Sequence, residues 1–585
     1  MHKQFMLNLL HAPLAMLNWV ARLLRRQQNG TASEMGTCSA APIHDGPATE
    51  LQAAFDRGKE LFSNAQYGRA AEYFQAAIDT RHDWAEAHRY LGLALYQLDL
   101  YEDAADAFAM AICFSPKMGK AHFALALAER KLGRLEAALV SVERALAYGE
   151  RNAEAFNVRG ALLFDRGDVG GALASFESAV EADPAHAPAH SNLGYILFRD
   201  FGQYDRGEEH IERALELDPE NIDIRCNYTM VVSLRGEHER ALALCNELLS
   251  IRPEMHEVRL NRAHVSLKLG RFETGWDDYE ARKLVRCNFV ARELPCPEWR
   301  GEGLGGKTIL IRGEQGLGDE IMFASCFGEF MAGAGQCVIE CAPRLERLFR
   351  RSFPGAIVFA GQQSAEVPAW WERAPAIDFQ IPAGSVPRYL RRSCAAFPDH
   401  RGYLVPDPRR VVYWRDRLAA LGSGPKVGIS WRGGMPSTRR NLRSIELAAW
   451  APLLRTSEAH FISLQYGDTV DERARVVREQ GFALNFWQEA IEDLDETAAL
   501  VAALDVVISV CTAVIHLAGA IGRPVWILVP TSPEWRYQVF GETMPWYPSA
   551  RLIRQRSPGD WQPAIDVAER RLRELVAASD RLRGR

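Results

Sequence analysis

Cysteine is scarce and scattered in this chain of 585 residues. Eleven cysteines occur, and the nearest two, Cys337 and Cys341, are four positions apart. No two Cys-x-x-Cys motifs and no group of His and Cys have the spacing of zinc ligands. The sequence therefore excludes a zinc module and a small disulfide-stapled scaffold. Isolated cysteines in a chain of this length are typical of reduced thiols in a core, which predicts a cytoplasmic protein.

The chain also lacks an excess of charge of one sign. Its formal net charge is −6, and 25% of its residues are charged. This balance gives no general attraction to nucleic acid, so we expect no nucleic-acid partner. A phosphate-bearing ligand would need a local group of basic side chains. The length favours two or three domains.

No uninterrupted apolar run long enough to cross a membrane is present. The most apolar stretch, residues 5–24, is interrupted by Asn8, His11, Pro13 and Asn18 and has no signal-cleavage site after it. A helix resting on a membrane or a partner and a locally docked terminal helix both fit, and we prefer the second. Peripheral contact with the inner membrane stays open. Small and polar residues up to position 48 predict a linker, so 1–48 forms an N-terminal segment and linker.

A repeat of 34 residues is the clearest positive feature. Sixteen residues after each small residue of the repeat a larger anchor recurs, and prolines close several units. Small residues let paired helices approach closely while the anchor fills the groove between them. This pattern resembles the tetratricopeptide (TPR) repeat and predicts about seven helical hairpins over 49–285. The small positions are Gly58, Gly92, Ala126, Gly160 and Gly194, and the anchors are Phe74, Phe108, Val142, Phe176 and, after one inserted residue, Ile211.

The last unit of the repeat carries additional aromatic residues, including Trp276 and Tyr279. They predict that this unit caps the array against the next domain. A TPR array presents a concave groove, so we expect a protein partner to bind there. A spacer or a dimerisation arm is the alternative.

After residue 300 the pattern changes to short apolar runs separated by helical stretches. Continuous apolar runs of this length indicate parallel strands covered on both faces. They predict two Rossmann-like lobes, at 300–410 and 420–578, with ligands beyond the carboxyl ends of the strands. The runs are 308–311, 338–340, 356–359 and 377–380 in the first lobe, and 427–431, 461–464, 506–510 and 525–529 in the second.

The first candidate site residues lie in the stretch GEQGLGDE, directly after the first strand. Gly316 and Gly318 permit close approach of a ligand at a helix N-terminus. Asp319 is placed to accept a proton from an attacking hydroxyl. The alternative is that Asp319 only caps the helix. Neither a dinucleotide fingerprint nor a P-loop occurs at this turn.

Two further motifs follow strands of the second lobe. Arg432 and Arg443 belong to an arginine-rich stretch whose guanidinium groups match a diphosphate, although a solvated loop is the alternative. The strand at 506–510 delivers Cys511 and Thr512 to a turn, and a helix starts there whose free N–H groups could bind phosphate, with Ala513 in that turn. His516 lies one turn into that helix. On this feature alone a packing histidine is the preferred interpretation of His516.

Taken in order, these motifs resemble glycosyltransferase family 9, whose members are heptosyltransferase-like enzymes with the GT-B fold. The resemblance rests on Gly-Leu-Gly-Asp-x-Ile, on Trp-Arg-Gly with downstream arginines, and on Thr-x-x-x-His-Leu-Ala-Gly-Ala-x-Gly-Arg-Pro, and it covers about 305–575. Bacterial proteins that join TPR units to such a domain are the most similar. The implied fold class is an α-helical TPR solenoid followed by an α/β GT-B domain with two Rossmann-like lobes.

The resemblance implies transfer of a sugar from a nucleotide-sugar donor to an acceptor hydroxyl, with inversion and without a metal or other cofactor. It makes Asp319 the general base and Arg443 a partner of the donor diphosphate. The remaining positions would bind or approach the donor: Gly316, Gly318, Arg432, Cys511, Thr512, Ala513 and His516. In the family an aspartate that contacts the donor sugar normally stands where this chain has Cys511, and a neutral thiol lacks that charge-assisted acceptor.

Two functions therefore stay open. In the first, the chain is a glycosyltransferase whose TPR array recruits a protein acceptor, or whose acceptor is a glycan. In the second, it is a non-catalytic TPR scaffold with a degenerate transferase domain, and Cys511 is the main support for that alternative.

Overall fold

The computed structural model describes residues 48–285, 289–361, 364–434 and 439–583. The predicted apolar segment at 5–24 and the linker lie outside these residues. The chain divides into two compact units, Met1–Leu193 and Gly194–Arg585. Within the described ranges, no helix is both long and apolar enough to span a membrane.

Helical hairpins fill the described chain as far as Tyr279, as the repeat predicts. Along most of the array each α-helix packs against the next one, which is the arrangement of a solenoid. The described helices make seven hairpins: α3 (Ala48–Ser63) with α4 (Tyr67–Thr80), α5 (Ala85–Gln97) with α6 (Tyr101–Phe114), α7 (Gly119–Lys131) with α8 (Leu135–Ala147), α9 (Ala153–Arg166) with α10 (Val169–Ala182), α11 (Ala187–Ile196) with α12 (Tyr204–Leu217), α13 (Ile222–Leu234) with α14 (His238–Ile251), and α15 (His256–Lys268) with α16 (Phe272–Tyr279).

The predicted small residues and anchors meet inside each hairpin. A Cβ atom placed on Gly58 would lie 2.7 Å from the Phe74 ring, and one placed on Gly160 would lie 2.5 Å from the Phe176 ring. These distances leave no room for a side chain, so glycine is what lets the two helices close on the anchor. The TPR prediction is confirmed.

The one-residue insertion before Ile211 is absorbed by a π-helical turn. Helix α11 continues as η1 (Leu197–Phe201), which is π-helical and ends at Gly202 with φ +63°. A π turn adds a residue without ending the helix. Gly194 therefore still meets its anchor, because a Cβ on Gly194 would lie 2.6 Å from Cγ1 of Ile211.

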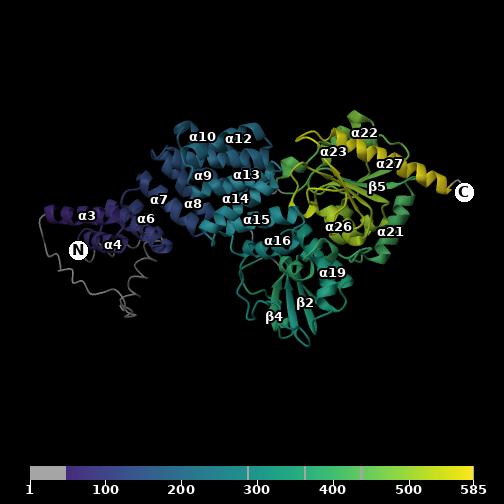
Figure 1. Ribbon diagram of the computed structural model, residues 1–585, viewed down its shortest axis with the longest axis horizontal. Helices are drawn as coiled ribbons and strands as arrows, with labels where there is room; N and C mark the ends of the chain where they lie inside the picture. The colour runs from purple at the N-terminus through teal and green to yellow at the C-terminus, as the bar shows by residue number, and fades with distance from the viewer. Residues whose placement is uncertain (1–47, 286–288, 362–363, 435–438, 584–585) are drawn as a thin grey trace. The chain divides into compact units, whose positions relative to one another are not determined.

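The first of two α/β lobes contains a four-stranded parallel sheet in the order β3-β2-β1-β4. Strand β1 is buried almost throughout, as expected for a parallel sheet covered on both faces. Figure 1 shows β2 and β4 in this sheet, with α19 beside it. The elements are β1 (Thr308–Arg312), α17 (Leu317–Phe323), α18 (Phe327–Met331), β2 (Gln336–Cys341), α19 (Glu346–Ser352), β3 (Ala356–Ala360) and β4 (Phe379–Pro382).

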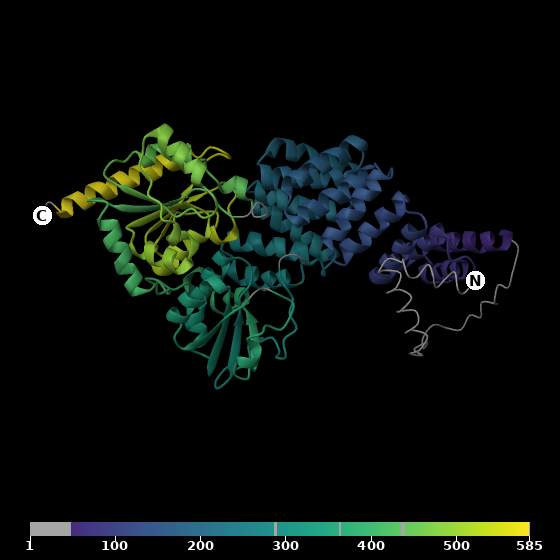
Figure 2. The ribbon, with the colours of Figure 1, turned by 180° about the vertical axis from the view of Figure 1, so that it is seen from behind.

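The second lobe contains a five-stranded parallel sheet in the order β6-β5-β7-β8-β9. Helices α22, α23 and α27 lie on one side of it and α21 and α26 on the other (Figure 1, and from behind in Figure 2). The strands are β5 (Lys426–Ser430), β6 (His460–Ser463), β7 (Val506–Val510), β8 (Val525–Val529) and β9 (Ala550–Arg554), and the helices are α21 (Pro408–Ala419), α22 (Ala451–Leu454), α23 (Val470–Gln480), α24 (Gln488–Glu492), α25 (Leu494–Ala503), α26 (Ala513–Ile521) and α27 (Gln562–Arg583). The predicted α/β architecture of this region is confirmed.

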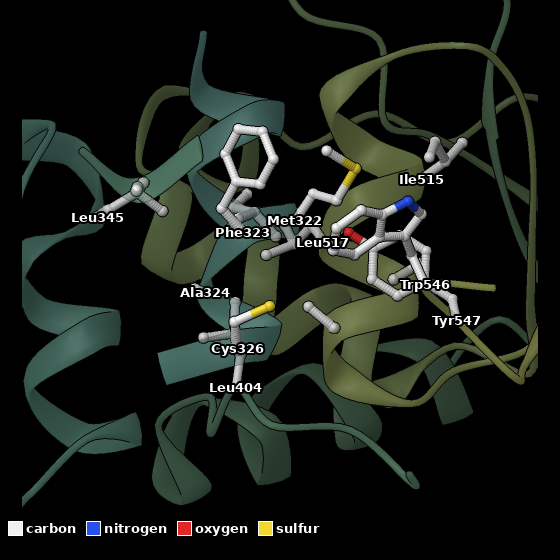
Figure 3. Close-up of a cluster of buried hydrophobic side chains, with 14 of the residues drawn as sticks. Met322, Phe323, Ala324, Cys326, Leu345, Leu404, Ile515, Leu517, Trp546 and Tyr547 are labelled. Carbon is white, nitrogen blue, oxygen red and sulfur yellow. The ribbon is translucent and has the colours of Figure 1, made fainter. Parts of the chain in front are cut away.

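One hydrophobic core runs through both lobes and the last TPR hairpin. Met322 of α17 packs with Leu517 of α26, and Trp546 lies beside them (Figure 3). From α16, Trp276 donates through Nε1 to the carbonyl of Arg391 at 2.9 Å, and its ring packs edge-on against Trp546. The prediction that the last repeat caps the array against the next domain is confirmed.

Candidate functional site

Each motif singled out from the sequence follows the carboxyl end of a parallel strand. Strand β1 ends at Arg312 before α17, and β7 ends at Val510 before α26. The strand order reverses beside β1 in the first sheet and between β5 and β7 in the second. Ligands of open α/β sheets bind at such switch points.

The N-termini of α17 and α26 face each other at the junction of the two lobes. A Cβ atom on Gly318 would lie 2.9 Å from Cδ2 of His516 and 3.6 Å from Cα of Ala513. Gly318 therefore lies where the N-termini of the two helices meet. One helix follows a strand of the first sheet, and the other follows a strand of the second. Gly316 is the N-cap of α17, and its N–H donates to Oδ2 of Asp319 at 3.2 Å. Asp319 thus does cap its helix.

The second carboxylate oxygen of Asp319 points to the other lobe. Its Oδ1 lies 2.6 Å from Nη1 of Arg536, which belongs to the 3-10 helix η11 (Trp535–Tyr537) after β8. Burial raises the pKa of Asp319, the positive charge of Arg536 opposes that rise, and the charge of Glu534 adds to it. The net result is a pKa above the ordinary aspartate value.

Glu534 joins this pair to a second arginine. Its carboxylate lies 3.1 Å from Nη2 of Arg536 and 3.1 Å from Nη1 of Arg443. Burial alone would raise the pKa of Glu534, but Arg536 and Arg443 outweigh it and the pKa falls to about 2. The series Asp319–Arg536–Glu534–Arg443, called the ion chain below, therefore crosses from one lobe to the other as alternating charges.

The loop before η9 (Arg440–Arg443) adds a third arginine. Arg439 has a left-handed backbone with φ +59°, and its Nε donates to the carbonyl of Arg199 in the π-helical turn at 3.2 Å. Its charge is among those that lower the pKa of Glu534. Arg439, Arg443 and Arg536 thus act together on Glu534.

Cys511 and Thr512 lie at the start of α26. Thr512 is the N-cap, and its Oγ1 accepts the N–H of Val514 at 3.2 Å. The Cys511 thiol donates to the carbonyl of Leu528 at 3.7 Å. Burial, with the charge of Glu534, raises the pKa of Cys511 to about 12, so the thiol is neutral at physiological pH. It lines a cavity of about 10 Å³ beside the ion chain, which has room for about one water.

His516 and Arg432 have different surroundings. Nδ1 of His516 is 3.0 Å from the hydroxyl of Tyr547, and burial, with the charge of Arg536 adding to it, lowers its pKa well below the ordinary value. The imidazole is therefore neutral, as expected of a packing histidine that also borders the site. Arg432 pairs with Glu472 of α23 at 3.1 Å and does not join the ion chain.

The last TPR hairpin forms a further wall of the site. The amide of Gln315 donates to the hydroxyl of Tyr279 in α16 at 2.8 Å. Arg282, which follows α16, donates to both oxygens of Glu314 at 2.9 and 2.7 Å. The turn that carries Gly316 is thus held by residues of the array.

The sequence analysis does not single out Glu534, Arg536 or Arg282, whereas it does single out Tyr279 as part of the cap against the next domain. A signal for the first two was present, because Glu534 and Arg536 follow β8 at the same edge of the sheet as Cys511. No sequence motif indicated that Tyr279 and Arg282 reach the turn after β1.

Comparison with known proteins shows similarity in both parts of the chain. Tetratricopeptide-repeat family models match residues 55–121, 123–187 and 163–225. The protein FlbA of Caulobacter vibrioides is 34% identical over 414 residues, which cover 68% of this chain and 69% of that protein.

Solved structures with chains similar to this one include YrrB and PilF. YrrB, described as a TPR protein with an unusual peptide-binding site, is 21% identical and covers 32% of this chain and 96% of its own, with a TM-score of 0.27. Pseudomonas aeruginosa PilF is 14% identical and covers 36% of this chain and 96% of its own, with a TM-score of 0.32.

Proposed function

The chain belongs to the FlbA family, and on the geometry of its ion chain we propose that it is a glycosyltransferase of the GT-B fold that moves a sugar from a nucleotide-sugar donor to an acceptor hydroxyl. The observation that carries the proposal is the apposition of Asp319, on α17, with the N-terminus of α26 and the arginines of the second lobe. A proton acceptor and an anion site thus meet at one junction of two parallel sheets.

The second lobe supplies the anion site. Arg443 and Arg536 present guanidinium groups beside the N-terminus of α26, where Thr512 and Ala513 begin the helix. Guanidinium forks and free N–H groups match phosphate oxygens. A donor diphosphate competes with Glu534 for both arginines and carries more negative charge than a single carboxylate. In the transfer step the same groups stabilise the charge that develops on the leaving diphosphate.

Asp319 supplies the proton acceptor on the opposite side. The acceptor hydroxyl gives its proton to the Asp319 carboxylate as its oxygen forms a bond to the anomeric carbon of the donor. The bond from that carbon to the diphosphate oxygen breaks, and the nucleoside diphosphate leaves with the electron pair. Attack from the face opposite the leaving group inverts the anomeric configuration. A pKa raised by burial suits Asp319 to this role, since it increases the proton affinity of the carboxylate.

Nucleotide binding is the first test of the proposal. A panel of nucleoside diphosphates and nucleotide sugars is screened for a rise in melting temperature, because a ligand that binds only the folded state stabilises it. Arg443→Met raises the nucleotide concentration that gives the same rise in melting temperature at least tenfold. Arg571→Met is the matched control, since Arg571 pairs with Glu542 away from the ion chain. If no nucleotide stabilises the wild-type chain, the proposal is wrong.

Turnover of the nucleotide sugar that binds is the second test. Asp319→Asn lowers release of nucleoside diphosphate from the donor by about 10²–10⁴-fold while leaving donor affinity within a fewfold of wild type. Asp378→Asn is the matched control. Asp378 also accepts a backbone N–H, from Thr308 at 2.8 Å, but it directly precedes β4 and so lies at the amino ends of the strands of the same sheet. Equal activity in the two variants would remove Asp319 from the reaction.

A non-catalytic scaffold is the second candidate, and the neutral Cys511 thiol favours it. A buried thiol that donates to Leu528 offers no charged acceptor to a sugar hydroxyl. Cys511→Asp separates the two functions. A large gain in donor hydrolysis or transfer would show that Cys511 weakens the natural site. If the wild-type chain turns over the donor and Cys511→Asp does not increase that turnover, the result counts against the scaffold.

The TPR array contributes a protein-binding surface in both functions. In the transferase it presents a protein acceptor to the site, which agrees with the position of the last hairpin beside Gln315. Co-purification of a partner that is lost when the first four hairpins are deleted would test this role, and transfer of labelled sugar to that partner would identify it as the acceptor.

A further inference from the structure

A second cavity lies where the π-helical turn of the array meets the second lobe. Its volume is about 210 Å³, and both of its walls belong to the compact unit Gly194–Arg585. Phe201 and Tyr204 form the wall from the array, and Thr531, Ser532 and Gln555 form part of the wall from the second lobe. The lobe residues follow the carboxyl ends of β8 and β9, where ligands of parallel sheets bind.

The inserted residue of the fifth hairpin is what brings the array to this cavity. The π turn ends at Gly202, where a Cβ atom would lie 3.0 Å from Leu442 of the second lobe. The carbonyl of Arg199, in the same turn, accepts from Arg439. Because π-helical insertions frequently mark functional sites, the position of this one is informative.

Two buried polar atoms in the wall have no hydrogen-bond partner among the residues that the structure describes. Oε1 of Gln555 accepts the N–H of Thr531 at 3.2 Å, which fixes the amide and leaves Nε2 buried without an acceptor. Oγ of Ser532 is also buried without a partner. Both residues are less than 8% exposed. Unpaired buried polar atoms cost free energy, and a ligand in the cavity would supply the partners that these two atoms lack.

The cavity also offers aromatic surface. Phe201 and Tyr204 line it from the array, and Trp561 lines it from the second lobe. Aromatic rings together with amide and hydroxyl groups suit a ligand that has an apolar face and hydroxyls at its edge. A volume of about 210 Å³ is more than ten times what one water needs, which is the scale of one sugar ring.

We infer that this cavity binds one neutral monosaccharide unit, with its ring against Tyr204 and Trp561 and its hydroxyls on Gln555 and Ser532. The inference stands without the transfer reaction. The cavity shares Arg439, Leu442, Pro530 and Ser532 with the smaller cavity at Cys511. A sugar bound here therefore lies next to the ion chain, where it belongs either to an acceptor glycan or to a separate binding subsite.

Saturation-transfer NMR on the full chain tests this inference. The probes are methyl glucoside, methyl galactoside, methyl mannoside, N-acetylglucosamine and N-acetylgalactosamine, each at a concentration on the order of 10 mM, since single sugars bind weakly. At least one probe gives a transfer signal. Gln555→Leu and Asn441→Ala each weaken its binding at least tenfold. Asn441 is an exposed residue of the cavity rim, so this variant keeps the test valid even when Gln555→Leu unfolds.

Gln488→Leu is the matched control, because Gln488 is an exposed helical glutamine that donates to Glu492 of its own helix and does not line the cavity. It leaves sugar binding unchanged. The inference is overturned if no probe binds, or if binding survives in Asn441→Ala and in a folded Gln555→Leu. If the chain binds a nucleotide but no sugar, this inference is wrong and the proposed transfer reaction is unaffected. If it binds a sugar but no nucleotide, only the proposed transfer reaction is wrong.

Discussion

Removing Arg536 breaks the ion chain at its centre. The side chain of Arg536 is only 12% exposed and pairs with Asp319 at 2.6 Å and with Glu534 at 3.1 Å. Arg536→Met leaves two half-buried carboxylates without this partner: the side chain of Asp319 is 17% exposed and that of Glu534 is 29% exposed. Glu534 keeps another arginine, Arg443. Removing one partner of a fully buried ion pair costs about 3–5 kcal/mol. Because water partly screens both carboxylates here, we expect a loss of about 2–3 kcal/mol in the free energy of unfolding at pH 8.

The loss depends on pH in a defined direction. Without Arg536, burial raises the pKa of Asp319 further above 3.8, since the opposing charge is gone. The folded state then binds more protons than the unfolded state above pH 4, and stability falls as pH rises. Arg536→Met should therefore regain part of its lost stability at pH 5.5, where Asp319 is increasingly protonated.

Urea unfolding followed by tryptophan fluorescence measures both effects. Twelve of the fourteen tryptophans follow residue 193, so the signal reports mainly on the unit that contains the ion chain. Arg573→Met is the matched control, because its pair with Glu569 on α27 is 70% exposed on the arginine side and is worth no more than about 0.5 kcal/mol. A loss below about 1 kcal/mol in Arg536→Met, or an equal loss at both pH values, would refute the reasoning.

Three other properties of the same unit give further predictions. Burial lowers the pKa of Lys268 to about 7, so the unfolded state binds more protons between pH 7 and about 10, and stability rises with pH there by up to about 1.4 kcal/mol per unit. Lys268→Met removes this slope, which urea unfolding at pH 7 and 8.5 detects. A Cβ on Gly519 would lie 2.3 Å from the Tyr547 ring, so Gly519→Ala loses about 1–3 kcal/mol, whereas Gly328→Ala, with nothing within 4 Å, loses nothing measurable. A chain that starts at residue 286 loses Trp276 from the shared core and should aggregate, whereas one that starts at 187 stays soluble in size-exclusion chromatography.

The parts of the fold that follow local rules could be predicted from the sequence. The TPR hairpins repeat one contact, such as that of Gly58 with Phe74, so the spacing alone identifies them. Eight strands were visible as apolar runs, although β4 lies two residues later than predicted, at Phe379–Pro382. Strand β9 was missed because it forms the sheet edge and its run contains the exposed Arg551, which breaks the apolar pattern.

The candidate site could be predicted only where strand ends bring its residues together. Gly318, Asp319 and His516 meet because their strands are parallel and their helices start at the same edge of each sheet. Glu534 and Arg536 carry no motif, and their importance depends on a pairing with Asp319 that no local spacing encodes. The contact of α16 with the turn after β1 is likewise a tertiary feature.

The compact units divide the repeat array itself, and the division coincides with the hairpin that carries the insertion. The unit boundary at Gly194 lies just before the π-helical turn Leu197–Phe201, and the hairpins beyond it share a compact unit with both α/β lobes. Those later hairpins supply Tyr279 to the ion-chain wall and Tyr204 to the second cavity, so their exposed sequence is constrained by the site. The last three hairpins therefore act as part of the catalytic core that we propose.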